Sequence, residues 1–136
     1  MAAPLYLDTS AVLHAVLETG TTPEVESRLR DAPVLITSRL SLVESARALH
    51  RARVLDALPE PRLADAEREV DAIWARCDVW ELTRGVCDLA RTVAPAKIIR
   101  TLDALHLATF VLARRRVEGL ELLSTDDRLL AAAGVV

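Results

Sequence analysis

The amino-acid sequence predicts an α/β fold in three layers, with a central parallel sheet of four to five strands between layers of helices. Short apolar runs of strand length recur along the chain, and longer segments with apolar residues at helical spacing follow them. Proline, glycine or hydroxyl residues separate these segments. Strands that alternate with helices favour a parallel sheet, joined by right-handed crossovers and covered by helices on both faces.

The first expected strand is the apolar run Leu5 to Leu7. Thr9 and Ser10 are suitable N-caps for a helix that continues to about Thr19, and Gly20 is a suitable C-terminal cap. The remaining helices are expected at about residues 23–30, 41–55, 63–77, 84–93, 101–116 and 126–133, and the remaining strands at 33–37, 78–82 and 121–125, with 135–136 as a candidate start of a fifth strand.

Length and composition favour one globular domain over residues 1–136. The chain is 51% hydrophobic, enough for a normal core, but only 3% aromatic, which argues against a base-stacking platform for single-stranded nucleic acid. Its net charge is -3, so it is no polycation. Nucleic acid would therefore be bound through a local patch or a metal ion.

Cysteine usage and hydropathy indicate a cytoplasmic protein without a membrane partner. Cys77 and Cys87 form no CxxC pair and no zinc-type cluster, and two isolated cysteines fit a reducing compartment. The N-terminus lacks the basic and apolar regions of a signal peptide, and no apolar stretch is long enough for a membrane span.

Four acidic residues are placed where chemistry is expected. Asp8 and Asp126 follow expected strands, while Glu44 and Asp103 lie near the starts of helices. Strand ends and helix starts of this kind can all lie at the carboxyl edge of one parallel sheet, where the four carboxylates would converge. Converged carboxylates repel one another unless a cation joins them, and an oxygen-only ligand set favours Mg²⁺ or Mn²⁺. Such ions support phosphoryl chemistry, with a phosphodiester as the natural substrate.

Each acid also has a simpler explanation. Asp126 is a good N-cap, Asp103 complements the positive end of a helix dipole, and Glu44 is placed for a surface ion pair with Arg47 or Arg51. The spacing alone leaves these alternatives open.

Four segments, in order along the chain, carry a resemblance to a known family: LDTSA at 7–11, SLVE at 41–44, TLDALHLA at 101–108, and STDDRL at 124–129 with AAAG at 131–134. They resemble the PIN-domain ribonucleases and, among these, the VapC toxins of bacterial toxin–antitoxin pairs.

The resemblance implies that Asp8, Glu44, Asp103 and Asp126 are the acidic ligands of Mg²⁺ or Mn²⁺. It also implies endonucleolytic cleavage of RNA, a homodimer, and a small antitoxin whose C-terminal arm blocks the site. Asp127 doubles the fourth acid, and the motif favours Asp126 as the residue that faces the metal.

Neighbouring residues have two interpretations each. Thr9 and Ser10 are placed to hydrogen-bond a metal ligand or a metal-bound water, or to cap a helix. Arg47 and Arg51 share the face of Glu44 and are candidates for contacts with RNA phosphates, although a solvated helix face explains them equally well. His106 follows Asp103 by one turn on the same helix face. It is placed either to support a metal ligand or to pack in the core, and we favour packing.

Two rival functions remain at this stage. A haloacid dehalogenase-type phosphatase would use a strand-end aspartate as nucleophile, but it needs a second aspartate two residues later, where this chain has Ser10, and a supporting lysine, for which only Lys97 is available. A PIN-like module that binds RNA or protein without cutting is the other rival, and the presence of all four acids argues against it.

Overall fold

The computed structural model describes residues 2–18, 20 and 22–136. Its sheet has four parallel strands, β1 (Leu5–Leu7), β2 (Leu35–Ser38), β3 (Asp78–Trp80) and β4 (Glu121–Leu123), in the order β3-β2-β1-β4. The α/β class is confirmed. The expected fifth strand is wrong, because residues 135–136 form a turn and an irregular end outside this sheet.

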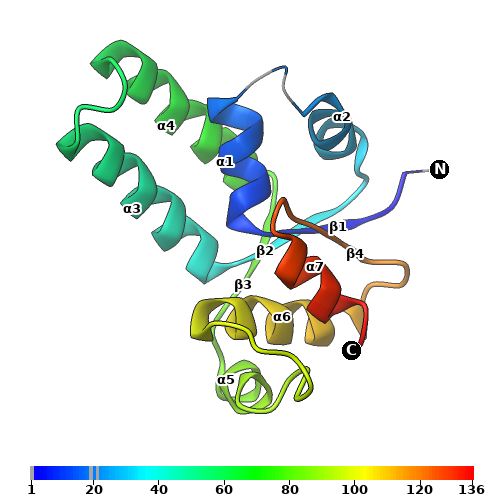
Figure 1. The fold of residues 1–136 in the computed structure, drawn as a ribbon. Helices are drawn as coiled ribbons and strands as arrows, with labels where there is room; N and C mark the ends of the chain where they lie inside the picture. Colours follow the sequence, from blue (N-terminus) through cyan, green and yellow to red (C-terminus); the bar gives the residue numbers. More distant parts are fainter. Residues whose placement is uncertain (1, 19, 21) are drawn as a thin grey trace.

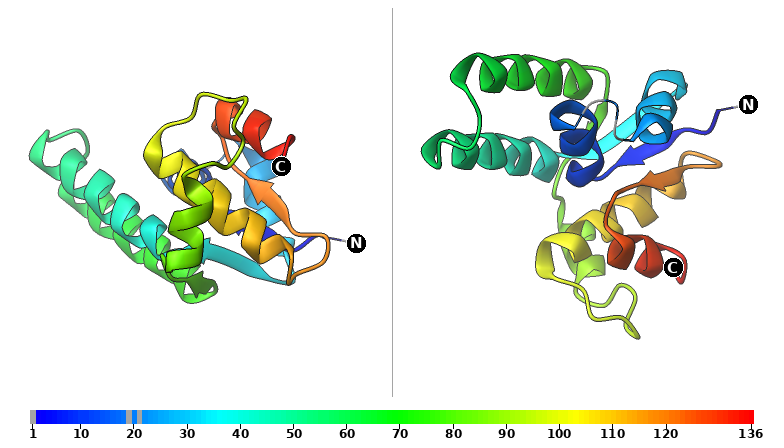
Figure 2. Two further views of the ribbon diagram at one scale, coloured as in Figure 1. Left: turned by 90° about the horizontal axis from the view of Figure 1, so that it is seen from below. Right: turned by 45° about the horizontal axis from the view of Figure 1, so that its top comes forward.

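Helices cover both faces of the sheet, as Figures 1 and 2 show. One layer holds α1 (Thr9–Leu17), α2 (Pro23–Asp31), α3 (Arg39–Val54) and α4 (Glu60–Ala75), and the other holds α5 (Arg84–Ala90), α6 (Thr101–Arg114) and α7 (Asp127–Ala133). The long pair α3 and α4 extends well beyond the sheet. No helix in the described part of the chain combines the length and apolarity needed to cross a membrane.

Side chains of the central strands alternate between two cores, as the pleat of a strand requires. Leu5 and Leu7 pack with buried residues of α1, α3 and α4. Tyr6 and Ile36 point to the opposite side and pack with Leu107 and Phe110 of α6. Tyr6 is thus the residue through which β1 contacts the helix that carries Asp103.

The start of α1 differs from the sequence-based expectation. Asp8 is the N-cap, so Thr9 and Ser10 lie inside the first turn and their predicted capping role is wrong. The helix ends at Leu17 with Glu18 as its C-cap, so Gly20 does not cap it, and the expected end at Thr19 lies outside the described residues. Because Asp8 is the N-cap, the hydroxyl groups of Thr9 and Ser10 are available for hydrogen bonds to Glu44 and Asp8.

Candidate metal centre

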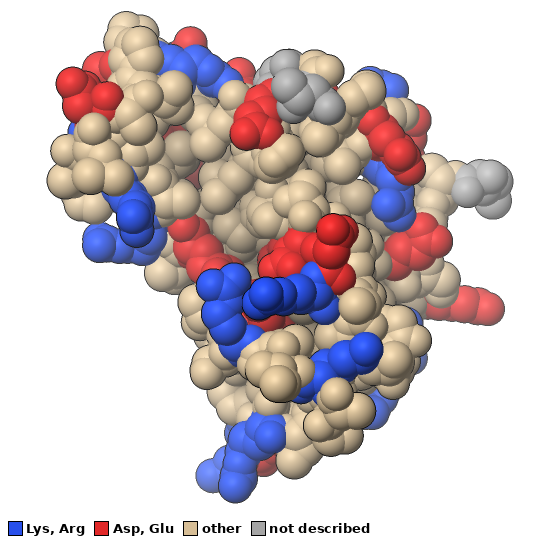
Figure 3. Space-filling model, in the orientation of Figure 1, with Lys and Arg blue, Asp and Glu red and all other residues tan. Residues whose placement is uncertain are grey.

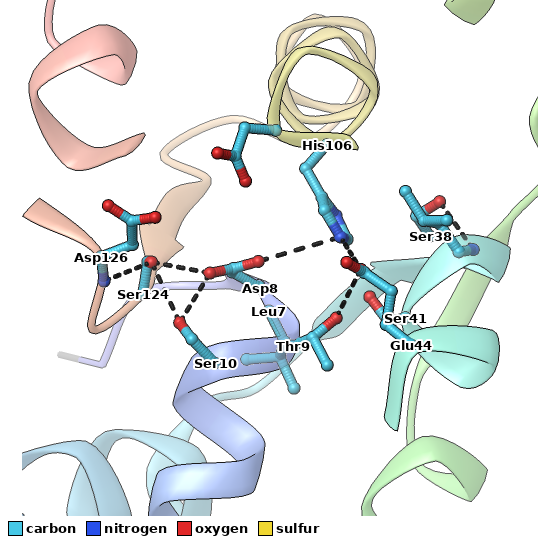
Figure 4. Close-up of polar contacts among 12 residues, drawn as sticks. Leu7, Asp8, Thr9, Ser10, Ser38, Ser41, Glu44, His106, Ser124 and Asp126 are labelled. Atoms are coloured by element: carbon cyan, nitrogen blue, oxygen red, sulfur yellow. Dashed lines mark hydrogen bonds and ion pairs between the residues drawn. The ribbon is translucent and has the colours of Figure 1, made fainter. Parts of the chain in front are cut away.

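The carboxyl edge of the sheet brings together the loops that follow β1 and β4. Leu7 is paired with Leu123 across these strands, and the backbone N–H of Asp8 donates to the carbonyl of Leu123 at 3.0 Å. Asp8 and Asp126 therefore follow neighbouring strands, as their sequence positions predicted. Figure 4 shows both side chains below the start of α6.

Two serine hydroxyls hold one oxygen of Asp8. Asp8 is 6% exposed, and its Oδ2 accepts hydrogen bonds from Ser10 Oγ at 2.6 Å and Ser124 Oγ at 2.8 Å. Ser124 Oγ also accepts from the backbone N–H of Asp126 at 2.9 Å, which ties the two loops together. The other oxygen, Oδ1, lies 3.8 Å from Nε2 of His106. Asp8 is therefore fixed from the β4 side and turns Oδ1 towards α6.

Glu44 projects from α3 to the same place. Its Oε1 accepts hydrogen bonds from Thr9 Oγ1 at 2.9 Å and from His106 Nε2 at 2.6 Å. Partial burial opposes ionisation, but the hydrogen bonds and positive potential from His106, together with the bond from Thr9, hold the pKa of Glu44 below its ordinary value. Glu44 is thus an ionised carboxylate bonded to α1 and α6, and not a surface ion-pair partner.

Asp103 lies in the first turn of α6, and the charges of the other acids affect its pKa. Partial burial raises its pKa, the negative charges of Asp126 and Asp8 raise it further, and Arg100, whose Nε is 3.7 Å from Oδ2 of Asp103, offsets part of the effect. Asp103 therefore lies within electrostatic range of Asp126 and Asp8, and the three negative charges disfavour one another.

The negative charge of Asp126, and not that of Asp127, raises the pKa of Asp103. Its Oδ1 caps α7 by accepting from the backbone N–H groups of Arg128 at 2.9 Å and Leu129 at 3.3 Å, so the simpler N-cap role is present. The same carboxylate contributes negative charge at Asp103, whereas Asp127 is exposed in the first turn of α7. The N-cap role and a place in the acidic cluster are therefore compatible.

His106 was expected mainly to pack in the core, and Tyr6 and Ser124 were not among the expected site residues. His106 is buried, as expected of a packing residue, but it also contacts Glu44 on another helix. The hydroxyl after β4 was the available signal for Ser124. Arg47 and Arg51 are exposed on α3, and neither forms an ion pair with Glu44 within the described residues.

The chemistry of the donors fits a hard divalent cation. The acids offer only oxygen atoms, and negative charge accumulates at Asp103. Figure 3 shows acidic side chains gathered in the middle of this face, with basic side chains beside them. Among the described residues, no three acidic, histidine or cysteine side chains lie close enough together to bind one metal ion. The acids thus share one edge of the sheet but are not drawn together as ligands of one ion.

A model of the PIN domain matches residues 5–135 of this chain. The chain belongs to the PIN domain family. Its PIN domain is 38% identical over 106 residues to Ribonuclease VapC45 of Mycobacterium tuberculosis, a match that covers 77% of this chain and 73% of the relative. Ribonuclease VapC46 of the same species is 32% identical over 131 residues, which cover 96% of this chain and 91% of the relative.

Solved structures share the fold of this PIN domain. PAE2754 from Pyrobaculum aerophilum superposes with a TM-score of 0.67 at 21% identity, over 97% of this chain and 81% of that one. A toxin–antitoxin complex from Klebsiella pneumoniae gives a TM-score of 0.62 at 18% identity, over 91% of this chain and 87% of that one. At these identities the likeness concerns the fold alone.

Proposed function

We propose that this PIN-domain chain is a metal-dependent endoribonuclease and the toxin of a toxin–antitoxin pair. The observation that carries the proposal is the placement of Asp8, Glu44, Asp103 and Asp126 at one sheet edge, in a chain 38% identical to a ribonuclease. The match of the PIN model to residues 5–135 favours the ribonuclease over the phosphatase alternative.

In this mechanism Asp8, Glu44, Asp103 and Asp126 would hold Mg²⁺ or Mn²⁺, with Asp8 and Asp103 as the principal pair. The bound ion would activate a water molecule and neutralise charge on the scissile phosphate. Ser10 and Ser124 keep the Asp8 carboxylate in place, and Thr9 does so for Glu44.

Substrate and partner contacts belong to the same proposal. Arg47 and Arg51, both exposed on α3, would position RNA phosphates without reading the sequence. A small antitoxin protein is the expected partner, since a matched structure is a toxin–antitoxin complex, and a homodimer is the expected assembly. Expression of this chain alone in the bacterial cytoplasm should then arrest growth. A small protein encoded beside this chain should relieve the arrest. Harmless expression of folded, active nuclease would contradict the toxin role.

The nuclease is tested with purified protein, RNA and Mn²⁺. Asp8→Asn should lower the cleavage rate by about 100-fold or more, since a catalytic metal supplies several kcal/mol of transition-state stabilisation. Asp127→Asn is the matched control, because it makes the same substitution at an exposed acid beside Asp126, outside the cluster, and should cleave like the wild type. Equal cleavage by wild type and Asp8→Asn would refute the mechanism. RNA binding without cleavage would support the non-cutting module, and turnover of a phosphomonoester without RNA cleavage would support a phosphatase.

A further inference from the structure

A buried pair of polar rings lies behind the candidate metal centre. Tyr6 of β1 is 0% exposed and His106 of α6 is 1% exposed, and the tyrosine hydroxyl is 2.8 Å from Nδ1 of the histidine. The Tyr6 ring also packs edge-on against Phe110 at 5.9 Å between centroids. A phenylalanine at position 6 would keep this packing, so the hydroxyl is the feature that packing does not explain.

The direction of the hydrogen bond between His106 and Glu44 follows from the chemistry of the carboxylate. An ionised carboxylate only accepts hydrogen bonds, so Nε2 of His106 must carry the proton in its 2.6 Å contact with Oε1 of Glu44. This holds for the neutral and for the protonated imidazole alike. Nδ1 is then the atom that contacts the hydroxyl of Tyr6, so hydrogen bonds hold the ring at both nitrogens.

Both donors to Glu44 bind the same oxygen. Oε1 receives the imidazole N–H and the hydroxyl of Thr9, whereas Oε2 accepts no hydrogen bond from the described residues. The same imidazole atom lies 3.8 Å from Oδ1 of Asp8, so His106 stands between two of the four acids. Since Asp103 and His106 are three residues apart on α6, one helix face supplies both an acid and the donor that orients another acid.

We propose that Tyr6 and His106 are positioning residues of the metal centre: Tyr6 fixes the imidazole of His106, which holds Oε1 of Glu44 and leaves Oε2 for the metal. This inference rests on the proposed metal-dependent function. Groups that hydrogen-bond to metal ligands in this way typically contribute about 10–100-fold to metal affinity.

Two substitutions of His106 separate positioning from packing. In His106→Gln the side-chain amide nitrogen can take the place of Nε2 and still donate to Glu44, whereas the shorter side chain of His106→Asn reaches only the Nδ1 position. Tyr6→Phe removes one hydroxyl and keeps the core aromatic, so it tests the pair even if a substitution at 106 fails to fold. Thermal melting of each variant in EDTA measures its structural cost independently of metal.

The decisive readout is the affinity of the folded, metal-free variants for Mn²⁺ alone, measured by the signal of free Mn²⁺ in electron paramagnetic resonance. We expect His106→Asn to weaken Mn²⁺ binding by about tenfold or more, Tyr6→Phe to weaken it less, and His106→Gln to stay close to the wild type. Equal affinities for folded wild type, His106→Asn and Tyr6→Phe would overturn the positioning role.

Failure of the proposed function gives a different pattern. Wild-type protein that binds no Mn²⁺ would overturn the metal centre and this inference with it. Wild-type protein that binds Mn²⁺ in the expected order of variants, yet cleaves no RNA, would support the positioning pair and refute the ribonuclease.

Discussion

Hydroxyl groups are the immediate partners of two acids at the site. Ser10 and Ser124 bond Oδ2 of Asp8, and Thr9 bonds Oε1 of Glu44. Neutral donors stabilise an ionised carboxylate without cancelling its charge, so the acids remain able to attract a cation.

Removing one of these donors should weaken the site. In Ser124→Ala, Asp8 loses one of its two serine partners and the backbone N–H of Asp126 loses its acceptor, so we expect Mn²⁺-dependent cleavage to fall about tenfold. The matched control is Thr125→Ala on the exposed neighbouring position, which should leave the initial rate unchanged. Equal rates for the two variants would show that Ser124 does not support Asp8.

The two cysteines should differ in reactivity. Burial raises the pKa of Cys77 to about 12, while Cys87 is exposed on α5. Since the thiolate is the reactive form, a raised pKa leaves little of it at pH 8. An aromatic disulfide reagent at pH 8 should therefore label Cys87 quickly in the native protein and both cysteines only after denaturation. Cys87→Ser removes the fast phase. Two equal native rates would contradict this burial.

At the level of elements, a buried hydrogen bond joins α3 to α4. The indole N–H of Trp74 donates to Oγ of Ser45 at 2.9 Å, inside the core that both helices form. Ser45→Ala leaves this N–H unpaired, and an unsatisfied buried donor costs about 1–3 kcal/mol. Urea unfolding should show this loss, whereas Ala46→Ser, one position along at an exposed site, should change the free energy of unfolding by less than about 0.5 kcal/mol. An unchanged urea midpoint for Ser45→Ala would show that the hydrogen bond between Trp74 and Ser45 does not stabilise the packing of α3 on α4.

Element order and strand positions were predictable because hydrophobic periodicity depends on local sequence. The exceptions have physical causes. Asp8 directly follows β1 and is already the N-cap of α1, so the cap lies one residue before the expected Thr9. The final segment stays out of the sheet because Val136 packs beside α6 and its carbonyl accepts from Arg114 at 2.8 Å.

The candidate site was predictable only in part. A strand-end position and motif spacing point to Asp8 and Asp103, since both depend on nearby residues. The contact between His106 and Glu44 joins residues 62 positions apart, and the contact between Tyr6 and His106 joins residues 100 apart. Such contacts depend on how α3, β1 and α6 pack, which no local pattern encodes.

For the whole molecule, we expect the stability of the fold to increase when a divalent metal ion binds at the acidic edge of the sheet. Partial burial raises the pKa of Asp103, the negative charges of Asp126 and Asp8 raise it further, and a bound cation would offset this charge repulsion. A ligand that binds only the folded state stabilises it by about 2.7 kcal/mol at 100 times its Kd. We therefore expect Mn²⁺ to raise the Tm of the wild type by several degrees, and EDTA to reverse the shift. Asp8→Asn should melt at a similar temperature in EDTA but lose the response. An equal shift in both proteins would mean that Mn²⁺ binds elsewhere.

The most direct measurement locates the metal itself. Crystals of the wild-type protein soaked in Mn²⁺, with anomalous scattering recorded near the manganese edge, show where the ion binds. We expect an anomalous peak in contact with carboxylate oxygens of Asp8 and Asp103, with Glu44 and Asp126 beside it, and no such peak in Asp8→Asn crystals. Wild-type crystals with no peak at this edge of the sheet, or with a peak that persists in Asp8→Asn, would contradict it.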